Sequence, residues 1–151
     1  MVYIDKQNFN ISVDKVDNSF ECDDMIADTV SLLNRKGYTT KYSCSGHPST
    51  NFRLVDTYIA FDKDIKLPYI PDYKIDPISF EYVKEHNFNI LRLNLLEAKA
   101  TLGMLMMINY ALLEWSRSLP IYDEDTKYAS KVFDIFDKIM EGMDDLKWMK
   151  K

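Results

Sequence analysis

Three stretches of the chain repeat apolar residues at helical spacing, and each predicts a helix. The first covers residues 22–37 and ends at Gly37, which suits a C-terminal cap because glycine accepts positive φ. The second, residues 96–118, is apolar almost all round, which is typical of a helix enclosed by the protein. The third carries one apolar stripe opposite a charged face. That stripe consists of Tyr128, Val132, Ile135, Phe136, Ile139, Met143 and Leu146.

Alternating and β-branched segments predict strands between these helices. Residues 38–44 and 54–61 are the clearest, and a hairpin-like connection would make them antiparallel. Residues 88–95 are a third candidate, and residues 78–86 are ambiguous. Short alternations at 2–4 and 9–13 are weak candidates for two edge strands, and a proline-rich loop is expected over 62–77.

Strand alternation also predicts which residues share a face. In the strand 38–44 we expect Cys44 to lie with the core-facing side chains, and Ser43 and Ser45 to lie on the opposite face. The core-facing set would be Tyr38, Thr40, Tyr42 and Cys44. The expected fold class is α+β, with a small, mainly antiparallel sheet packed by an N-terminal helix and two long C-terminal helices in a single domain, residues 1–151.

Composition narrows the functional classes. A content of 46% hydrophobic and 28% charged residues is globular, and the net charge of −5 with interleaved acids argues against a long nucleic-acid partner. The longest charge-free run, residues 100–113, would rise only about 21 Å as a helix, too short for a bilayer. The N-terminus lacks the pattern of a signal peptide, so we expect a cytoplasmic protein whose Cys22 and Cys44 remain thiols.

The most distinctive segment is the turn Ser43–Pro48, with the sequence Ser-Cys-Ser-Gly-His-Pro. Gly46 permits a concave array of backbone N–H groups, and the hydroxyls of Ser43 and Ser45 can bind phosphate, ribose or carboxylate. His47 can donate, accept or exchange a proton near neutral pH. An ordinary turn of small residues is the alternative interpretation.

Other polar residues extend this candidate site. Asn51 and Arg53 lie in the same loop, and Tyr58 offers a ring on which a base can stack. Arg92 stands on a half-apolar strand, where its partner is either a protein carboxylate or an anionic ligand. Together these residues predict a site for an anionic small molecule.

Catalysis and metal binding are weaker interpretations of the same residues. Cys44 as a nucleophile would need a lowered pKa, and a core-facing thiol that anchors the turn is the commoner case. A zinc site from Cys22, Cys44, His47 and His86 lacks a second paired motif at the usual spacing, so no metal is expected. The helix at 96–118 contains Met104, Met106 and Met107, which indicate core filling or, as the alternative, an oligomer interface.

The run from Ile26 through Leu32-Leu33-Asn34 and Gly37-Tyr38-Thr39-Thr40 to Ser43-Cys44-Ser45-Gly46 resembles part of a known family. It is similar to the N-terminal helix, strand and Ser-Ser-Cys-Ser-Gly-Arg turn of the wybutosine-synthesis tRNA methyltransferases. Here Tyr42 replaces the first serine and His47 replaces the arginine. The resemblance covers under a fifth of the chain and implies S-adenosylmethionine as cofactor; no cofactor is expected otherwise.

The arrangement Lys-Gly-Tyr-x-Thr…Ser-Cys-Ser-Gly-His also resembles small proteins of phages and low-GC bacteria. Among small phage proteins with a polar pocket are some that sequester nucleotide immune signals, and this resemblance implies a role in anti-defence. Three hypotheses therefore remain open. The leading one is binding of a phosphate-bearing small molecule such as a nucleotide. The second is an enzyme acting on a nucleotide or RNA, by His47 acid–base catalysis or methyl transfer. The third is a homo-oligomeric module assembled through residues 96–118.

Overall fold

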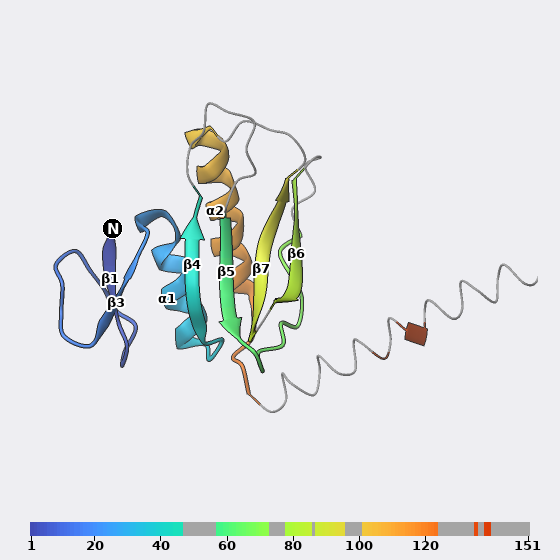
Figure 1. Ribbon diagram of the computed structural model, residues 1–151, viewed down its shortest axis with the longest axis horizontal. Helices are drawn as coiled ribbons and strands as arrows, with labels where there is room; N and C mark the ends of the chain where they lie inside the picture. Colours follow the sequence, from blue (N-terminus) through green and yellow to red (C-terminus); the bar gives the residue numbers. More distant parts are fainter. Residues whose placement is uncertain are drawn as a thin grey trace, which may run out of the picture.

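The structure is a computed structural model that describes residues 1–46, 57–72, 78–85, 87–95, 101–123, 135 and 138–139. It contains two antiparallel sheets together with helices, which confirms the predicted α+β class. Figure 1 shows a small N-terminal sheet beside helix α1 and a larger sheet in front of helix α2. None of the helices in the described part of the chain is both long enough and apolar enough to cross a membrane.

The N-terminal sheet has three strands in the order β2-β1-β3, and both pairings are antiparallel. The strands are β1 (Val2–Asp5), β2 (Ile11–Ser12) and β3 (Ser19–Cys22). Strand β1 confirms the strand predicted at 2–4, and β2 confirms residues 11–12 of the one predicted at 9–13. Of these two predicted edge strands only β2 lies at an edge, because β1 is the central strand of the sheet. Strand β3 was not predicted, because we assigned Cys22 to the first turn of the following helix.

The larger sheet has four strands in the order β4-β5-β7-β6, again with every pairing antiparallel. Its strands are β4 (Thr40–Ser45), β5 (Thr57–Asp62), β6 (Ile78–Glu85) and β7 (Phe88–Leu95). Strand β7 confirms the prediction for 88–95. Strand β4 confirms residues 40–44 of the strand predicted at 38–44, and β5 confirms residues 57–61 of the strand predicted at 54–61. The ambiguous residues 78–85 form β6, which pairs with β7 along its whole length.

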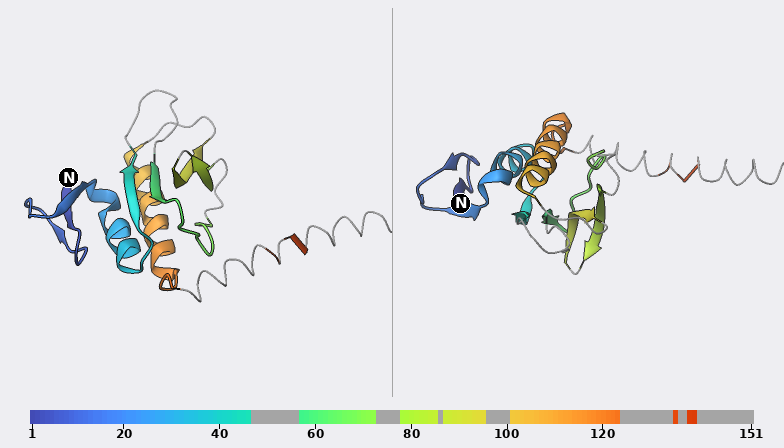
Figure 2. Two further views of the ribbon diagram at one scale, coloured as in Figure 1. Left: turned by 60° about the horizontal axis from the view of Figure 1, so that its bottom comes forward. Right: turned by 90° about the horizontal axis from the view of Figure 1, so that it is seen from above.

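Two α-helices cover one face of this sheet (Figure 2, right). A short 3-10 turn η1 (Asp24–Ile26) leads into α1 (Ala27–Arg35), and α2 (Leu102–Ser118) packs beside α1. Gly37 caps α1 as predicted: its φ is +95°, and its N–H donates to the carbonyl oxygen of Asn34 at 3.1 Å. A side chain at Gly37 would approach Tyr122 to 3.1 Å, so both backbone angle and space favour glycine.

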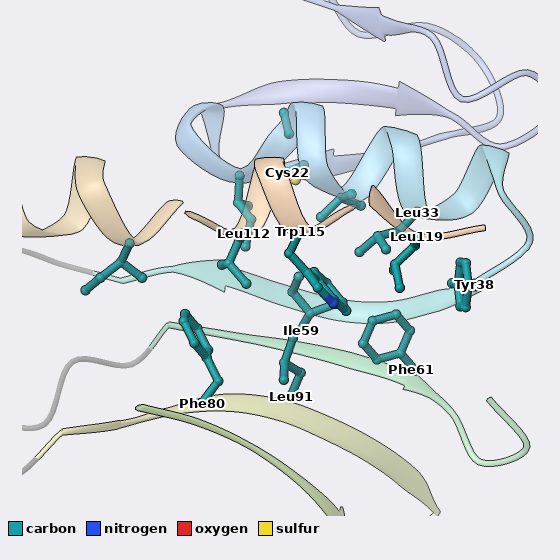
Figure 3. Close-up of a cluster of buried hydrophobic side chains, with 14 of the residues drawn as sticks. Cys22, Leu33, Tyr38, Ile59, Phe61, Phe80, Leu91, Leu112, Trp115 and Leu119 are labelled. Carbon is teal, nitrogen blue, oxygen red and sulfur yellow. The ribbon is translucent and has the colours of Figure 1, made fainter. Parts of the chain in front are cut away.

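The hydrophobic core lies between the helices and the inner face of the four-stranded sheet (Figure 3). Ile59, Phe61 and Leu91 reach up from the sheet, while Leu112 and Trp115 reach down from α2. Burying a residue of this kind stabilises the fold by about 1.5–3 kcal/mol, so this layer dominates stability.

Helix α2 differs from its prediction. Its sheet-facing side is buried, but Leu102 and Met106 on the other side are each 57% exposed. It is therefore a surface helix that is apolar on both sides, and not an enclosed one. Met107 is also 54% exposed, so the expectation of core methionines fails for Met106 and Met107, although Met104 packs against the core. The predicted C-terminal helix lies outside the described residues, except for Ile135, Lys138 and Ile139, which are helical.

A β-bulge in β4 overturns the expected face assignment. Thr40 pairs with Phe61, but Tyr42 pairs with Ala60, so Lys41 is an extra residue that shifts the alternation. After the bulge Tyr42 and Cys44 lie on the outer face of the sheet, and Tyr42 is 61% exposed. Cys44 is thus not a core-facing anchor.

Candidate functional site

The same bulge turns Ser43 and Ser45 toward the helices. Ser43 pairs with Ile59, which is fully buried beneath the helices, so the two side chains share the inner face. Ser43 Oγ lies 3.8 Å from Sγ of Cys22 on β3, and Ser43 is partly buried. Burial raises the pKa of Cys22 to about 11, so this thiol stays protonated at neutral pH and is a poor nucleophile.

Ser45 is the centre of a buried polar cluster where β4 ends. Oδ2 of Asp23 accepts hydrogen bonds from the backbone N–H of Ser45 at 3.1 Å and from its hydroxyl at 3.2 Å. The carbonyl oxygen of Ser45 accepts from Thr57 Oγ1 at 3.1 Å and from Asn109 Nδ2 at 3.0 Å. Ser45 is only 7% exposed, so its hydroxyl is engaged in contacts within the protein and not with solvent.

Asn109 of α2 contributes an unusual group to this cluster. Its Nδ2 also donates to the carbonyl oxygen of Leu105 at 2.8 Å and lies 3.3 Å from Sδ of Met25. Because these neighbours are all hydrogen-bond acceptors, they fix the orientation of the Asn109 side-chain amide, with Nδ2 directed toward them. Oδ1 then points elsewhere, is buried, and accepts no hydrogen bond from the residues described. Asn109 is 3% exposed, and an unsatisfied buried acceptor costs about 1–3 kcal/mol.

Gly46 ends the described part of the turn. Its φ is +90°, the left-handed region in which glycine carries no steric cost, as the sequence suggested. Its N–H donates to Sγ of Cys44 at 3.4 Å. This contact closes the end of β4 and fixes the direction in which the chain leaves toward residue 47.

Tyr58 and Arg92 lie on the other side of the sheet. Tyr58 pairs with Cys44 on one side and with Arg92 on the other, so these three share the outer face. Nε of Arg92 donates to Oε1 of Glu81 at 2.6 Å, and its Nη1 lies 3.6 Å from Oε2 of Glu85. The partners of Arg92 are thus protein carboxylates, which was the alternative to an anionic ligand.

The sheet therefore divides the predicted site into two groups. Ser43 and Ser45 face the helices, whereas Tyr58 and Arg92 face outward. Arg92 lies two strands away from Cys44, and adjacent strands are about 4.8 Å apart, so the two residues are about 10 Å apart. The remaining predicted residues lie outside the described part of the chain. These are His47, Asn51 and Arg53, as well as His86 of the zinc alternative.

Sequence reasoning missed two members of the cluster around Ser45. Asp23 was one of several acids at a helix start, which usually complement the helix dipole. Asn109 did carry a signal, because it is an amide within the charge-free run 100–113, where a buried helix would place apolar residues. A buried asparagine usually marks a polar partner across the core, and here that partner is the end of β4.

An open depression of about 620 Å³ lies at the opposite end of β5. It is lined by Asp62, Lys63, Asp64, Ile65, Asn87 and Tyr122. Thr57 and Asp62 mark the two ends of β5, so this depression is remote from Ser45 and shares no residue with the predicted site. No protein-family description, curated protein or solved structure matches the chain.

Proposed function

We propose that the protein binds a small phosphate-bearing molecule of nucleotide type where β4 ends, beyond Gly46. The observation that carries this proposal is that Oδ1 of Asn109, whose Nδ2 donates to the carbonyl oxygen of Ser45, is buried and accepts no hydrogen bond within the described part of the chain. A buried acceptor without a donor destabilises the fold, and a ligand that donates a hydrogen bond to it removes this cost. Most buried polar groups in native proteins have a hydrogen-bond partner, so an exception calls for an explanation, such as a bound group that supplies the missing donor.

Different residues would bind the two parts of such a ligand, its base or sugar and its phosphate. Asn109 offers an acceptor, so it suits the N–H or O–H donors of a base or a sugar. It does not suit a phosphate, which needs donors or cations. The phosphate would fall to His47 and Arg53, which follow Gly46 in sequence and supply donors and positive charge. Arg92 and Tyr58 have no part in this arrangement.

A melting-temperature screen tests the proposal. Nucleoside monophosphates, cyclic dinucleotides, S-adenosylmethionine and inorganic phosphate are each added to the full chain, since a ligand at 100 times its Kd stabilises by about 2.7 kcal/mol. At least one nucleotide should raise the melting temperature, and inorganic phosphate alone should raise it less. Chromatography of the recovered ligand then separates the binder from the enzyme, because a binder returns it intact.

Two variants locate the site. Asn109→Leu fills the same space without the Oδ1 acceptor, and His47→Ala removes the imidazole; each should abolish most of the ligand-induced shift. Circular dichroism checks that each variant still folds. If no compound in the screen stabilises the wild-type chain at millimolar concentration, the proposal is wrong.

An interaction module is a second candidate function, favoured by the bare outer side of α2. There Leu102, Met106, Met107 and Tyr110 are 54–63% exposed on neighbouring turns of one helix. A contiguous apolar surface of this kind is typical of protein–protein interfaces. The two candidates use different parts of the molecule, so one chain can carry both.

A further inference from the structure

A hollow of about 430 Å³ lies between α1, α2 and strand β2 of the N-terminal sheet. Helices α1 and α2 are packed side by side in this region (Figure 2). The volume falls in the range of small-molecule sites, about 300–1,000 Å³. Residues from all three elements line the hollow: Asp28, Leu32 and Arg35 from α1, Leu113 and Arg117 from α2, and Ile11 from β2. None of them belongs to the cluster around Ser45, so this hollow is separate from the site at the end of β4.

Arg35 and Arg117 lie at the same end of this hollow. Each stands in the last turn of its helix, Arg35 in α1 and Arg117 in α2. The two helix ends lie together, because Nζ of Lys36 donates to the carbonyl oxygens of Ser116 and Arg117 at 2.8 and 2.9 Å. Guanidinium groups from two helices therefore flank one end of the hollow, where both can donate to a single anion.

Arg35 is held at the hollow by a neutral group. Its Nη2 donates to Oδ1 of Asn10 at 2.7 Å, and in the described part of the chain no carboxylate forms an ion pair with it. The residue before Asn10 is also fixed. Phe9 has a φ of +63°, which is uncommon for a bulky residue, and Ser31 Oγ donates to its carbonyl oxygen at 2.6 Å. The loop before β2 thus positions Arg35 without neutralising its charge.

Apolar side chains form the middle of the hollow, and an acid stands at its far end. Leu32 and Leu113 are half-buried, and Ile11 is 37% exposed. Asp28 precedes Arg35 by two turns of α1, about 10 Å along the helix axis. A ligand with one anionic group at the arginines and an apolar body over the leucines fits this order of groups. A second anionic group at the far end would be repelled by Asp28.

We propose that this hollow binds a small amphipathic anion, a molecule with one carboxylate or phosphate group on an apolar body. The guanidinium groups of Arg35 and Arg117 bind the anionic group, while Leu32 and Leu113 contact the body. Glu114 competes with the ligand, because its Oε1 accepts from Nη1 of Arg117 at 2.6 Å. This ion pair is exposed and therefore weak, so the ligand can replace it. The inference depends neither on the nucleotide site nor on the interaction module.

Titration of the full chain with hexanoate and with hexyl phosphate, followed by amide NMR spectra, tests the proposal. At millimolar concentration at least one probe should shift the amide signals of Leu32, Arg35, Leu113 and Arg117. Hexanamide is a neutral molecule of the same shape as hexanoate, and acetate lacks the apolar body. Each should bind at least about tenfold more weakly than hexanoate, because each loses one of the two contacts. The ratio of the Kd values for the two probes shows whether the anionic group is a carboxylate or a phosphate.

Three variants at exposed positions assign the binding to these residues. Arg35→Gln with Arg117→Gln should raise the Kd of the bound probe at least about tenfold, because both charged donors are lost. Lys66→Gln with Lys84→Gln is the matched control: it removes the same charge outside the hollow and should leave the Kd unchanged. Glu114→Gln should lower the Kd, since it releases Arg117 from its ion pair. Circular dichroism checks that each variant folds.

Three results would overturn the proposal. If neither probe shifts the signals of the hollow, there is no site for an amphipathic anion. If hexanamide binds as tightly as hexanoate, the arginines do not select the ligand. If the lysine control loses as much affinity as the arginine variant, the attraction is a property of the whole surface and not of the hollow. None of these results bears on the end of β4, whose test uses nucleotides.

Discussion

The carboxylate of Asp23 holds Ser45 by two hydrogen bonds, at 3.1 Å to its backbone N–H and 3.2 Å to its hydroxyl. Asp23 precedes η1 and Ser45 ends β4, so this contact joins the start of the helical layer to the end of a sheet strand. It closes the inner side of the turn and puts the carbonyl of Ser45 within reach of Asn109.

Asp23→Ala should therefore lower the free energy of unfolding by about 1–3 kcal/mol, because the buried N–H of Ser45 loses its acceptor. Urea titration followed by circular dichroism measures the change. The control is Asp24→Ala: Asp24 pairs with the N-terminal amine, but its side chain is 68% exposed, so its loss should cost only about 0–1 kcal/mol. Equal effects of the two substitutions would contradict a special role for Asp23.

Lys36 fixes the end of α2. Its Nζ donates to the carbonyl oxygens of Ser116, Arg117 and Leu119 at 2.8, 2.9 and 2.6 Å. These carbonyls lie at the helix C-terminus, where a cation also complements the dipole. Burial lowers the pKa of Lys36, which offsets part of the gain.

Lys36→Met keeps the aliphatic part of the side chain and removes these hydrogen bonds. We expect the free energy of unfolding, measured by urea titration, to fall by about 1–3 kcal/mol. Lys6→Met, at an exposed position in the N-terminal sheet's first turn, provides the matched control and should change stability by less than about 0.5 kcal/mol. A Lys36 variant as stable as the control would show that the cap contributes nothing.

Tyr38 should make stability depend on pH in the alkaline range. Its ring is fully buried and its hydroxyl donates to the carbonyl oxygen of Pro120 at 2.8 Å. Burial, with smaller contributions from Tyr69 and Tyr122, raises the pKa of Tyr38 well above its ordinary value. The unfolded chain releases this proton near pH 10 while the folded chain keeps it, so the free energy of unfolding falls as the pH rises above about 10.

Tyr38→Phe should flatten this decline between about pH 9 and 11, measured as unfolding free energy against pH. Some slope should remain, because burial also raises the pKa of Tyr82. Tyr110→Phe is the control, since Tyr110 is 63% exposed and should leave the slope unchanged. A slope that Tyr38→Phe does not alter would contradict the assignment.

Arg92 should be dispensable for ligand binding. Its guanidinium is engaged by Glu81 and Glu85 on the outer face, and surface ion pairs contribute about 0–1 kcal/mol. Arg92→Met should therefore change stability by no more than that and preserve the ligand-induced rise in melting temperature. Loss of that rise would place the ligand on the outer face of the sheet.

Periodicity in the sequence predicted most of the helices and strands, but not which side of each one is buried. The cap at Gly37 and the strand at 88–95 follow from local chemistry, and both are confirmed. The two sides of α2 could not be told apart, because Met106 and Leu112 are both apolar and only packing decides which is buried. Strand β3 was missed because Cys22 and Ile26 also fit a helical spacing.

The candidate site was predictable only in part, for a related reason. A strand-to-turn motif suggests where polar groups gather, and the left-handed Gly46 agrees with that. The contacts of Ser45 with Asp23, Thr57 and Asn109 join residues that lie 22, 12 and 64 positions away. No local pattern encodes such contacts, so they required the fold.

The extra residue in β4 has a consequence for sequence length. Because Lys41 has no partner of its own on β5, deleting it would leave the pairs Thr40–Phe61 and Tyr42–Ala60 in place and keep Ser43 and Ser45 on the inner face. A residue inserted after Tyr42, in contrast, would turn Ser43 and Ser45 to the outer face or shift the register with β5. Near this turn, therefore, deletion of Lys41, whose exposed side chain makes an ion pair with Asp62, should be tolerated far better than an insertion after Tyr42.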